Sequence, residues 1–165
     1  MTDRSPSAES GEQALEDPPA PAKNRMAVAV LTLGGIFLAF YLVANNLGWV
    51  PRVPCGTGDC GIVQSSKYAW VGPIPVSAIG LGGYLALFVL SLLGLQESMA
   101  GSRLIALLLF GGALAGVLYS GYLTYLEAAV IKAWCRYCVA SAVLITIVFA
   151  ATIPEVKRIR GVGAG

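Results

Sequence analysis

Four long apolar runs constrain this chain more than any other feature of its sequence. They cover about residues 26–47, 75–95, 103–126 and 134–153. A helix needs roughly 20 residues to cross the hydrocarbon core of a bilayer, and each run is close to that length. The chain of 165 residues is 56% hydrophobic and only 12% charged, whereas soluble domains carry about 25% charged residues. The sequence therefore predicts an all-α integral membrane protein, a four-transmembrane-helix bundle.

The polar segments divide the chain around these runs. Residues 1–23 are rich in Ser, Glu, Pro and Ala without apolar periodicity, which predicts a disordered tail. An apolar run that begins this far into the chain argues against a cleaved secretory signal. Residues 48–74 form a long polar loop, and 156–165 form a short tail after Pro154, which we expect to end the last helix. The expected membrane domain is 24–155.

The distribution of cations predicts the orientation of the bundle. Four spans place both chain ends on the same side of the membrane. With the termini inside, the inner side carries seven cations and the outer side four. The inner ones are Arg4, Lys23, Arg25, Arg103, Lys157, Arg158 and Arg160, and the outer ones are Arg52, Lys67, Lys132 and Arg136. Positive charge favours the cytoplasmic side, so both termini are predicted to be cytoplasmic. The loop 48–74 and the start of the last helix then face an outer compartment, where disulfides persist.

The chain has four cysteines and no histidine. Cys55 and Cys60 lie in the polar loop, and Cys135 and Cys138 form a Cys-x-x-Cys pair where the last apolar run begins. The lack of histidine excludes histidine acid–base chemistry, histidine-bound haem and mixed Cys/His zinc sites. A net charge of +2 is too small to indicate nucleic-acid binding. Thiols are therefore the obvious reactive groups.

The Cys135–Cys138 pair has the features of a reactive dithiol. At a helix start, unpaired backbone N–H groups favour a thiolate, and Arg136 adds a nearby cation. Two sulfurs three residues apart on a helix share a face and can form a bridge. Trp134, Val139 and Val143 are expected to form an apolar wall on the membrane side. A flat, lipid-soluble oxidant would fit against that wall.

The loop pair suggests a shuttle. Cys55 and Cys60 are surrounded by three glycines, and a flexible dithiol can exchange with a soluble partner and with an inner pair in turn. From the residues alone other interpretations stay open: a structural disulfide in the loop, two structural disulfides without redox function, half of a zinc or iron–sulfur site, or one zinc ion held by all four cysteines. A small transporter would usually need more charge within the spans.

Taken in chain order, these features resemble the vitamin K epoxide reductase family in its bacterial form, over about residues 26–153. The features that match are the Cys55 and Cys60 pair, Ser66, the segment Ile74-Pro75-Val76, the segment Gly82-Gly83-Tyr84, and the Cys135-x-x-Cys138 pair. The DsbB-like family is also a four-helix, quinone-linked disulfide generator, but its Cys-x-x-Cys lies in the first outer loop and its shuttle pair in the second. The order found here favours the vitamin K epoxide reductase type.

The resemblance implies a quinone pocket near the outer face of the bundle, capped by the loop. The electron acceptor would be a membrane quinone, menaquinone or ubiquinone, with no metal. Cys138 would lie nearest the quinone ring, and Ser66 would shape the site, although a helix cap or a solvated loop position would also account for this serine. Animal enzymes carry a quinone-contacting tyrosine four positions after the second cysteine, where this chain has Ala142. Quinone reduction is therefore expected rather than epoxide reduction.

The implied function is that of a thiol-disulfide oxidoreductase of the bacterial inner membrane. It would reoxidise a separate thioredoxin-like, DsbA-type protein outside the cytoplasm and so support disulfide formation in exported proteins. The expected partner is separate because the chain ends at Gly165 without a fused thioredoxin-like domain. The reduced partner would attack the Cys55–Cys60 disulfide. The loop pair would then attack at Cys135, expected to be the more exposed inner sulfur, and Cys138 would reduce the quinone.

Overall fold

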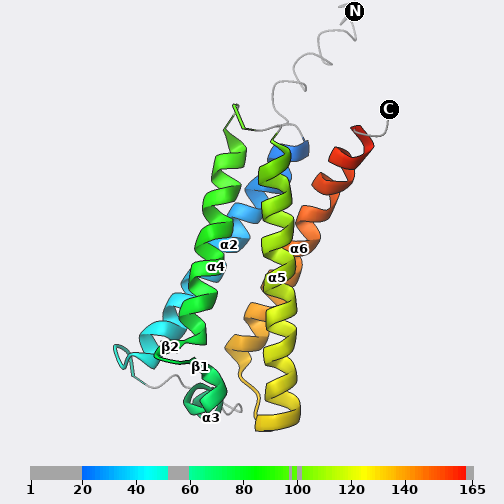
Figure 1. Ribbon diagram of the computed structural model, residues 1–165. Coiled ribbons are helices and arrows are strands. Elements are labelled where there is room, and N and C mark those ends of the chain that lie inside the picture. The colour runs from blue at the N-terminus through cyan, green and yellow to red at the C-terminus, as the bar shows by residue number, and fades with distance from the viewer. Residues whose placement is uncertain (1–19, 52–59, 97, 100–101, 163–165) are drawn as a thin grey trace, which may run out of the picture.

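The computed structural model describes residues 20–51, 60–96, 98–99 and 102–162. Its four long helices are α2 (Ala20–Asn46), α4 (Val76–Leu95), α5 (Arg103–Tyr125) and α6 (Arg136–Val162). They run side by side as an elongated bundle, and the start of α2 and the end of α6 lie at the same end (Figure 1). All four are long and apolar enough to cross a membrane. The predicted all-α membrane bundle is confirmed.

Two helix boundaries differ from the sequence prediction. The third helix does not stop near residue 126 but continues as a π-helix, η2 (Leu126–Ile131), so that its membrane-spanning candidate is Arg103–Ile131. The helix α2 begins at Ala20, inside the segment predicted to be a disordered tail, because Pro21 falls in the first turn, where a missing N–H costs nothing. Residues 1–19 of that predicted tail lie outside the described residues.

The helices pack in a ring in which α2 contacts α4 and α6, and α5 contacts the same two helices. Small residues allow the close approach. A Cβ atom at Gly35 would lie 2.4 Å from ring carbons of Tyr84, and one at Gly116 would lie 2.8 Å from a side-chain carbon of Ile145. Large apolar side chains such as Phe37 face outward and are exposed. Small residues inside and apolar side chains outside are the arrangement expected of helices packed in lipid.

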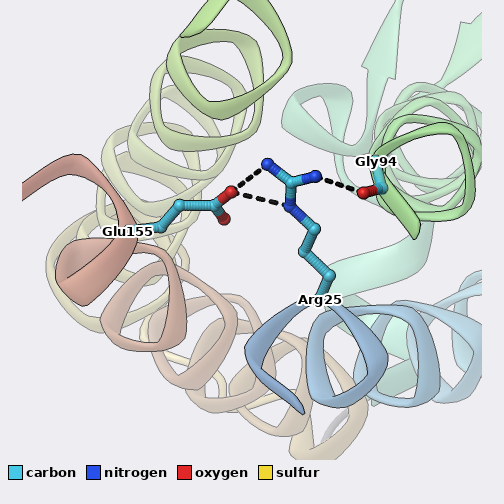
Figure 2. Close-up of polar contacts among 3 residues, drawn as sticks. All are labelled: Arg25, Gly94 and Glu155. Atoms are coloured by element: carbon cyan, nitrogen blue, oxygen red, sulfur yellow. Dashed lines mark hydrogen bonds and ion pairs between the residues drawn. The ribbon is translucent and has the colours of Figure 1, made fainter. Parts of the chain in front are cut away.

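A buried ion pair joins three helices at the end of the bundle where α2 begins and α6 ends (Figures 1 and 2). Arg25 of α2 is 2% exposed and Glu155 of α6 is 6% exposed. The Nε–H group of Arg25 donates to Glu155 Oε1 over 2.6 Å, and its Nη2–H group donates to the same oxygen. The Nη1–H group donates to the carbonyl of Gly94 in α4. Arg25 is therefore a structural crosslink as well as a charge at the chain end.

The expected helix stop at Pro154 is wrong, because α6 passes through Pro154 and ends at Val162. Proline inside a helix removes one backbone hydrogen bond and crowds the preceding turn. Here the next residue, Glu155, is held by its buried contacts to Arg25. We infer that this ion pair offsets the cost of Pro154 and keeps the helix continuous.

The opposite end of the bundle is covered by residues 60–75, which we call the cap (Figure 1). The cap contains α3 (Cys60–Ser65), the short 3-10 helix η1 (Lys67–Ala69), and two short strands, β1 (Trp70–Val71) and β2 (Ile74–Pro75). The strands pair antiparallel, with Trp70 opposite Pro75. The turn between them uses Gly72 at φ +61°, a conformation that glycine adopts without strain. The cap thus leads directly into α4.

Candidate functional site

The site is built on the π-helix η2 and the turn that follows it. The turn closes at Lys132, which has a left-handed backbone with φ 55°. Glu127, in the first turn of η2, then holds the returning chain through its backbone carbonyl and its side-chain carboxylate. Its carbonyl accepts a 3.2 Å hydrogen bond from the Ala133 N–H group, and its carboxylate Oε2 accepts a 3.1 Å hydrogen bond from the Cys135 N–H group. This turn sets the position from which α6 begins.

The Cys-x-x-Cys pair lies at the first turn of α6, as the sequence predicted, with both thiols free. Cys135 is fully buried, whereas Cys138 is partly exposed. The prediction that Cys135 is the more exposed sulfur is wrong, because the cap and the returning turn cover it. The Cys138 N–H group points at the Cys135 sulfur over 3.4 Å. The two residues form one reduced dithiol unit.

The surroundings lower the pKa of Cys135 below its ordinary value. The hydrogen bond from the Cys138 thiol has the largest effect, and backbone N–H groups of the first helical turn act in the same direction. Burial and the nearby Glu127 carboxylate oppose them. A thiolate stabilised at a helix start was the sequence expectation, and the direction of this shift agrees with it.

The cap brings one loop cysteine to this dithiol. Cys60, at the start of α3, is 3% exposed and belongs to the same buried cluster as Cys135, Ala133 and Val63. Cys60 is disulfide-bonded. Cys55, the other predicted loop cysteine, lies outside the described residues. The structure therefore brings together three of the four predicted cysteines.

A cavity of about 120 Å³ opens beside Cys138, between the cap and the four helices. Cys138 is on its wall, and Cys135 is not. Ser66 also lines it, and its hydroxyl donates a 2.7 Å hydrogen bond to the Val63 carbonyl, which fixes the end of α3. On the α4 side, the Tyr84 hydroxyl lies 3.0 Å from both the carbonyl and the hydroxyl of Ser141. The cavity thus combines an apolar wall with a few fixed polar groups.

The predicted apolar wall of Trp134, Val139 and Val143 does not border this cavity. All three residues border a separate surface depression, together with Ala142. Trp134 is 53% exposed, so most of its ring faces outward from the bundle. The wall prediction is wrong for the Cys138 cavity, whose apolar lining comes instead from α2, η2 and the end of α5. The helical turn, and not sequence proximity, decides which side chains face Cys138.

Glu127 is the residue at this site that the sequence analysis missed. Glu127 comes directly after the predicted third span, 103–126, yet the residue is 2% exposed and lines the cavity with Cys138. A sequence signal existed, because a lone carboxylate directly at the end of an apolar span is costly in a membrane and often marks a functional site. The π-helix that buries it had no comparable signal.

Glu127, Cys135 and Cys138 present a carboxylate oxygen and two sulfurs that all lie within 4.8 Å of one another. A structural zinc site takes four protein ligands. Cys60 packs against this group but is disulfide-bonded, so it offers no thiolate as a fourth ligand in this state. Among the described residues this cluster therefore offers three ligand atoms, two of which are the sulfurs of the free dithiol.

The comparison with known families decides between the remaining interpretations. The family described as the vitamin K epoxide reductase family matches residues 26–153. The chain belongs to this family. The match runs from the second turn of α2 to the last apolar turns of α6 and includes both cysteine pairs. Membership of this family supports a membrane thiol-disulfide oxidoreductase.

Proposed function

We propose that this family member oxidises a thioredoxin-like protein outside the cytoplasm and passes the electrons to a membrane quinone. The observation that carries the proposal is the placement of the two inner sulfurs. Cys135 packs with Cys60 of the cap, and Cys138 lines the cavity. One sulfur is thus placed for exchange with the loop pair and the other for an acceptor within the bundle. The protein would support disulfide formation in exported proteins of a bacterium.

The residues around Cys138 suit a quinone head group. Ligand sites of this kind are mainly apolar with a few directed polar groups, and this cavity has both. Leu42, Leu123 and Leu126 would pack against the ring, and the Tyr119 hydroxyl is a donor of the type that quinone carbonyls accept. A bound quinone would supply a two-electron, two-proton oxidant next to the dithiol. Menaquinone and ubiquinone share this chemistry.

The packing of the cap favours one order for the thiol relay. The reduced partner attacks the Cys55–Cys60 disulfide at Cys55, which releases Cys60 as a thiolate. Cys60 then attacks the Cys135 sulfur of an oxidised inner pair, which breaks the Cys135–Cys138 bond and releases Cys138 as a thiolate that takes up a proton. The second thiol of the partner breaks the partner–Cys55 disulfide and frees Cys55. Cys55 then attacks Cys60 in the Cys60–Cys135 disulfide, which restores the Cys55–Cys60 bond and releases Cys135. The sequence left open which loop cysteine serves the inner pair. The shared cluster of Cys60 and Cys135 supports Cys60 for that role.

The proposed orientation has both termini in the cytoplasm and the cap on the outer face of the bacterial inner membrane. The start of α2 and the end of α6 lie together at one end of the bundle, opposite the cap (Figure 1). With cations near both chain ends, the positive-inside rule supports this orientation. The partner would then reach the cap from the compartment where its own disulfide is used.

The proposal is tested with purified protein, a reduced thioredoxin-like protein and a short-chain quinone, by following quinone absorbance. Wild-type protein is expected to turn over many equivalents of quinone, and Cys138→Ala is expected to turn over none. Val143→Ala, on the same helix but outside the cavity lining, is the matched control and should retain wild-type rates. Full activity of Cys138→Ala, or no turnover by wild-type protein with either quinone class, would contradict the proposed function.

A further inference from the structure

Glu127 is a buried carboxylate in direct contact with the reacting dithiol. Its carboxylate oxygen and the sulfurs of Cys135 and Cys138 lie within 4.8 Å of one another. Carboxylate and thiol both border the cavity in which the acceptor is proposed to bind. A proton on Cys138 therefore has an acceptor at the cavity wall.

The position of this carboxylate is fixed by the fold. The Cys135 N–H group donates to its Oε2 atom, and the π-helix places its backbone against the returning turn. Positioned proton acceptors need such support, because a misplaced group loses most of its effect. Burying a carboxylate is costly, and the site retains one beside two sulfurs whose oxidation must release protons.

We propose that Glu127 is the proton acceptor for Cys138 when the inner dithiol is oxidised, an inference that rests on the proposed function. Oxidation forms one S–S bond between Cys135 and Cys138, and two electrons and two protons pass to the quinone to give the quinol. The Cys138 S–H proton moves to the Glu127 carboxylate and from there to the quinol. Cys135 loses its proton to water, and water supplies the second proton of the quinol. Glu127 ends each cycle ionised, as it began.

Two conservative variants distinguish a proton acceptor at Glu127 from a purely structural side chain. Glu127→Gln keeps the length of the side chain and an oxygen that can accept from the Cys135 N–H group, but it cannot take a proton. Glu127→Asp is shorter and weakens that contact but keeps a carboxylate. A structural role therefore predicts that Gln is tolerated and Asp is not. A proton acceptor predicts that Asp rescues part of what Gln loses.

The test is single-turnover oxidation of fully reduced protein by a short-chain quinone, with thiols counted by quenching and mass measurement. Glu127→Gln is expected to lower the rate constant about 100-fold, within the range that positioned acid–base groups contribute. Glu127→Asp is expected to fall between Gln and wild type. The matched control is Glu155→Gln, which removes a second buried carboxylate at the other end of α6, about 25 Å from Cys138 by helix rise. Measured below its unfolding range, it should keep the wild-type rate constant.

A second readout does not involve the quinone. In a background with Cys55, Cys60 and Cys135 replaced by Ser, alkylation by iodoacetamide reports the thiolate of Cys138 alone. Removing a neighbouring negative charge favours a thiolate, so Glu127→Gln is expected to alkylate about tenfold faster at neutral pH. Slower quinone oxidation combined with faster alkylation is the signature of a lost proton acceptor. Unchanged thermal stability of the variant excludes exposure through unfolding as the cause of faster alkylation.

Two results would overturn the inference. One is a Glu127→Gln variant whose dithiol is oxidised by quinone at the wild-type rate. The other is a slow Glu127→Asp variant together with a Glu127→Gln variant that keeps the wild-type rate. Either result leaves the proposed function intact, because wild-type protein still reduces quinone. If wild-type protein itself does not oxidise its dithiol with quinone, the proposed function fails first, and the alkylation comparison still reports whether Glu127 acts on Cys138.

Discussion

The Arg25–Glu155 crosslink allows a quantitative prediction about stability. Replacing Glu155 by Met leaves the Arg25 guanidinium, in a residue only 2% exposed, with the Gly94 carbonyl as its remaining contact among those described above. It loses two donated hydrogen bonds and the opposite charge. Breaking a buried ion pair by removing one partner costs about 3–5 kcal/mol. We expect a loss of unfolding free energy in that range, since both side chains are almost completely buried.

The double replacement provides the sharper test. With Arg25→Met and Glu155→Met together, no charge is left buried without a partner, and an apolar pair of similar volume is often close to neutral. The double variant is therefore expected to be more stable than either single variant, with a coupling energy of about 3 kcal/mol. The matched control is Thr146→Ala, an exposed position on α6 whose hydroxyl only bonds within the helix.

The assay is reversible unfolding in mixed micelles, followed by circular dichroism, together with the quinone-reduction rate at a temperature where every variant is folded. The rate should be unchanged, because Glu155 lies near the end of α6 and Cys138 lies near its start. If Glu155→Met costs less than about 1 kcal/mol, the value typical of a solvated surface pair, the buried crosslink does not exist as described. If the losses of unfolding free energy in the two single variants add up to the loss in the double variant, the two side chains are not coupled, even if each single variant is destabilised.

Two further predictions concern packing and the relay. Gly35→Ala should lower unfolding free energy by about 1–3 kcal/mol, because its Cβ atom would lie 2.4 Å from the Tyr84 ring, whereas Gly34→Ala, with nothing within 4 Å, should be neutral in the same unfolding assay. Mild oxidation of a Cys55→Ala/Cys138→Ala variant should give a Cys60–Cys135 disulfide, detected by peptide mass mapping, since both residues lie in one buried cluster. The Cys60→Ala/Cys138→Ala variant should crosslink more slowly, and equal rates would contradict the proposed order of the relay.

The number and positions of the spans could be predicted because they depend on length and hydropathy alone. The start of α4 at Val76 and of α6 at Arg136 lie within two residues of the predicted positions. Helix ends were harder to predict. Pro154 ordinarily ends a helix, but α6 continues through it to Val162. The next residue, Glu155, is held by Arg25, which is distant in the chain. Such tertiary contacts have no local signature in the sequence.

In the candidate site, too, some features could be predicted from the sequence and others could not. Cysteine spacing located the dithiol, because the chemistry needs two sulfurs within bonding reach. Which sulfur faces the cap and which faces the cavity depends on the turn after η2, and the sequence prediction for Cys135 was wrong for that reason. The prediction of an apolar wall beside Cys138 was wrong for a similar reason, because Trp134 precedes α6 and its side chain faces outward. Ser66 does line the cavity, but its catalytic significance stays a prediction.

Two carboxylates are buried among the described residues, and their surroundings distinguish them. Glu155 receives two N–H groups from one arginine, and its charge is matched within the bundle, so its environment accounts for its burial. Glu127 receives a backbone N–H group and adjoins two thiols that can lose protons. A carboxylate matched by a fixed positive charge gains nothing from taking up a proton, whereas one beside an oxidisable thiol can take up a proton when that thiol is oxidised. The partners of each carboxylate, more than its burial, therefore assign Glu155 to stability and Glu127 to chemistry.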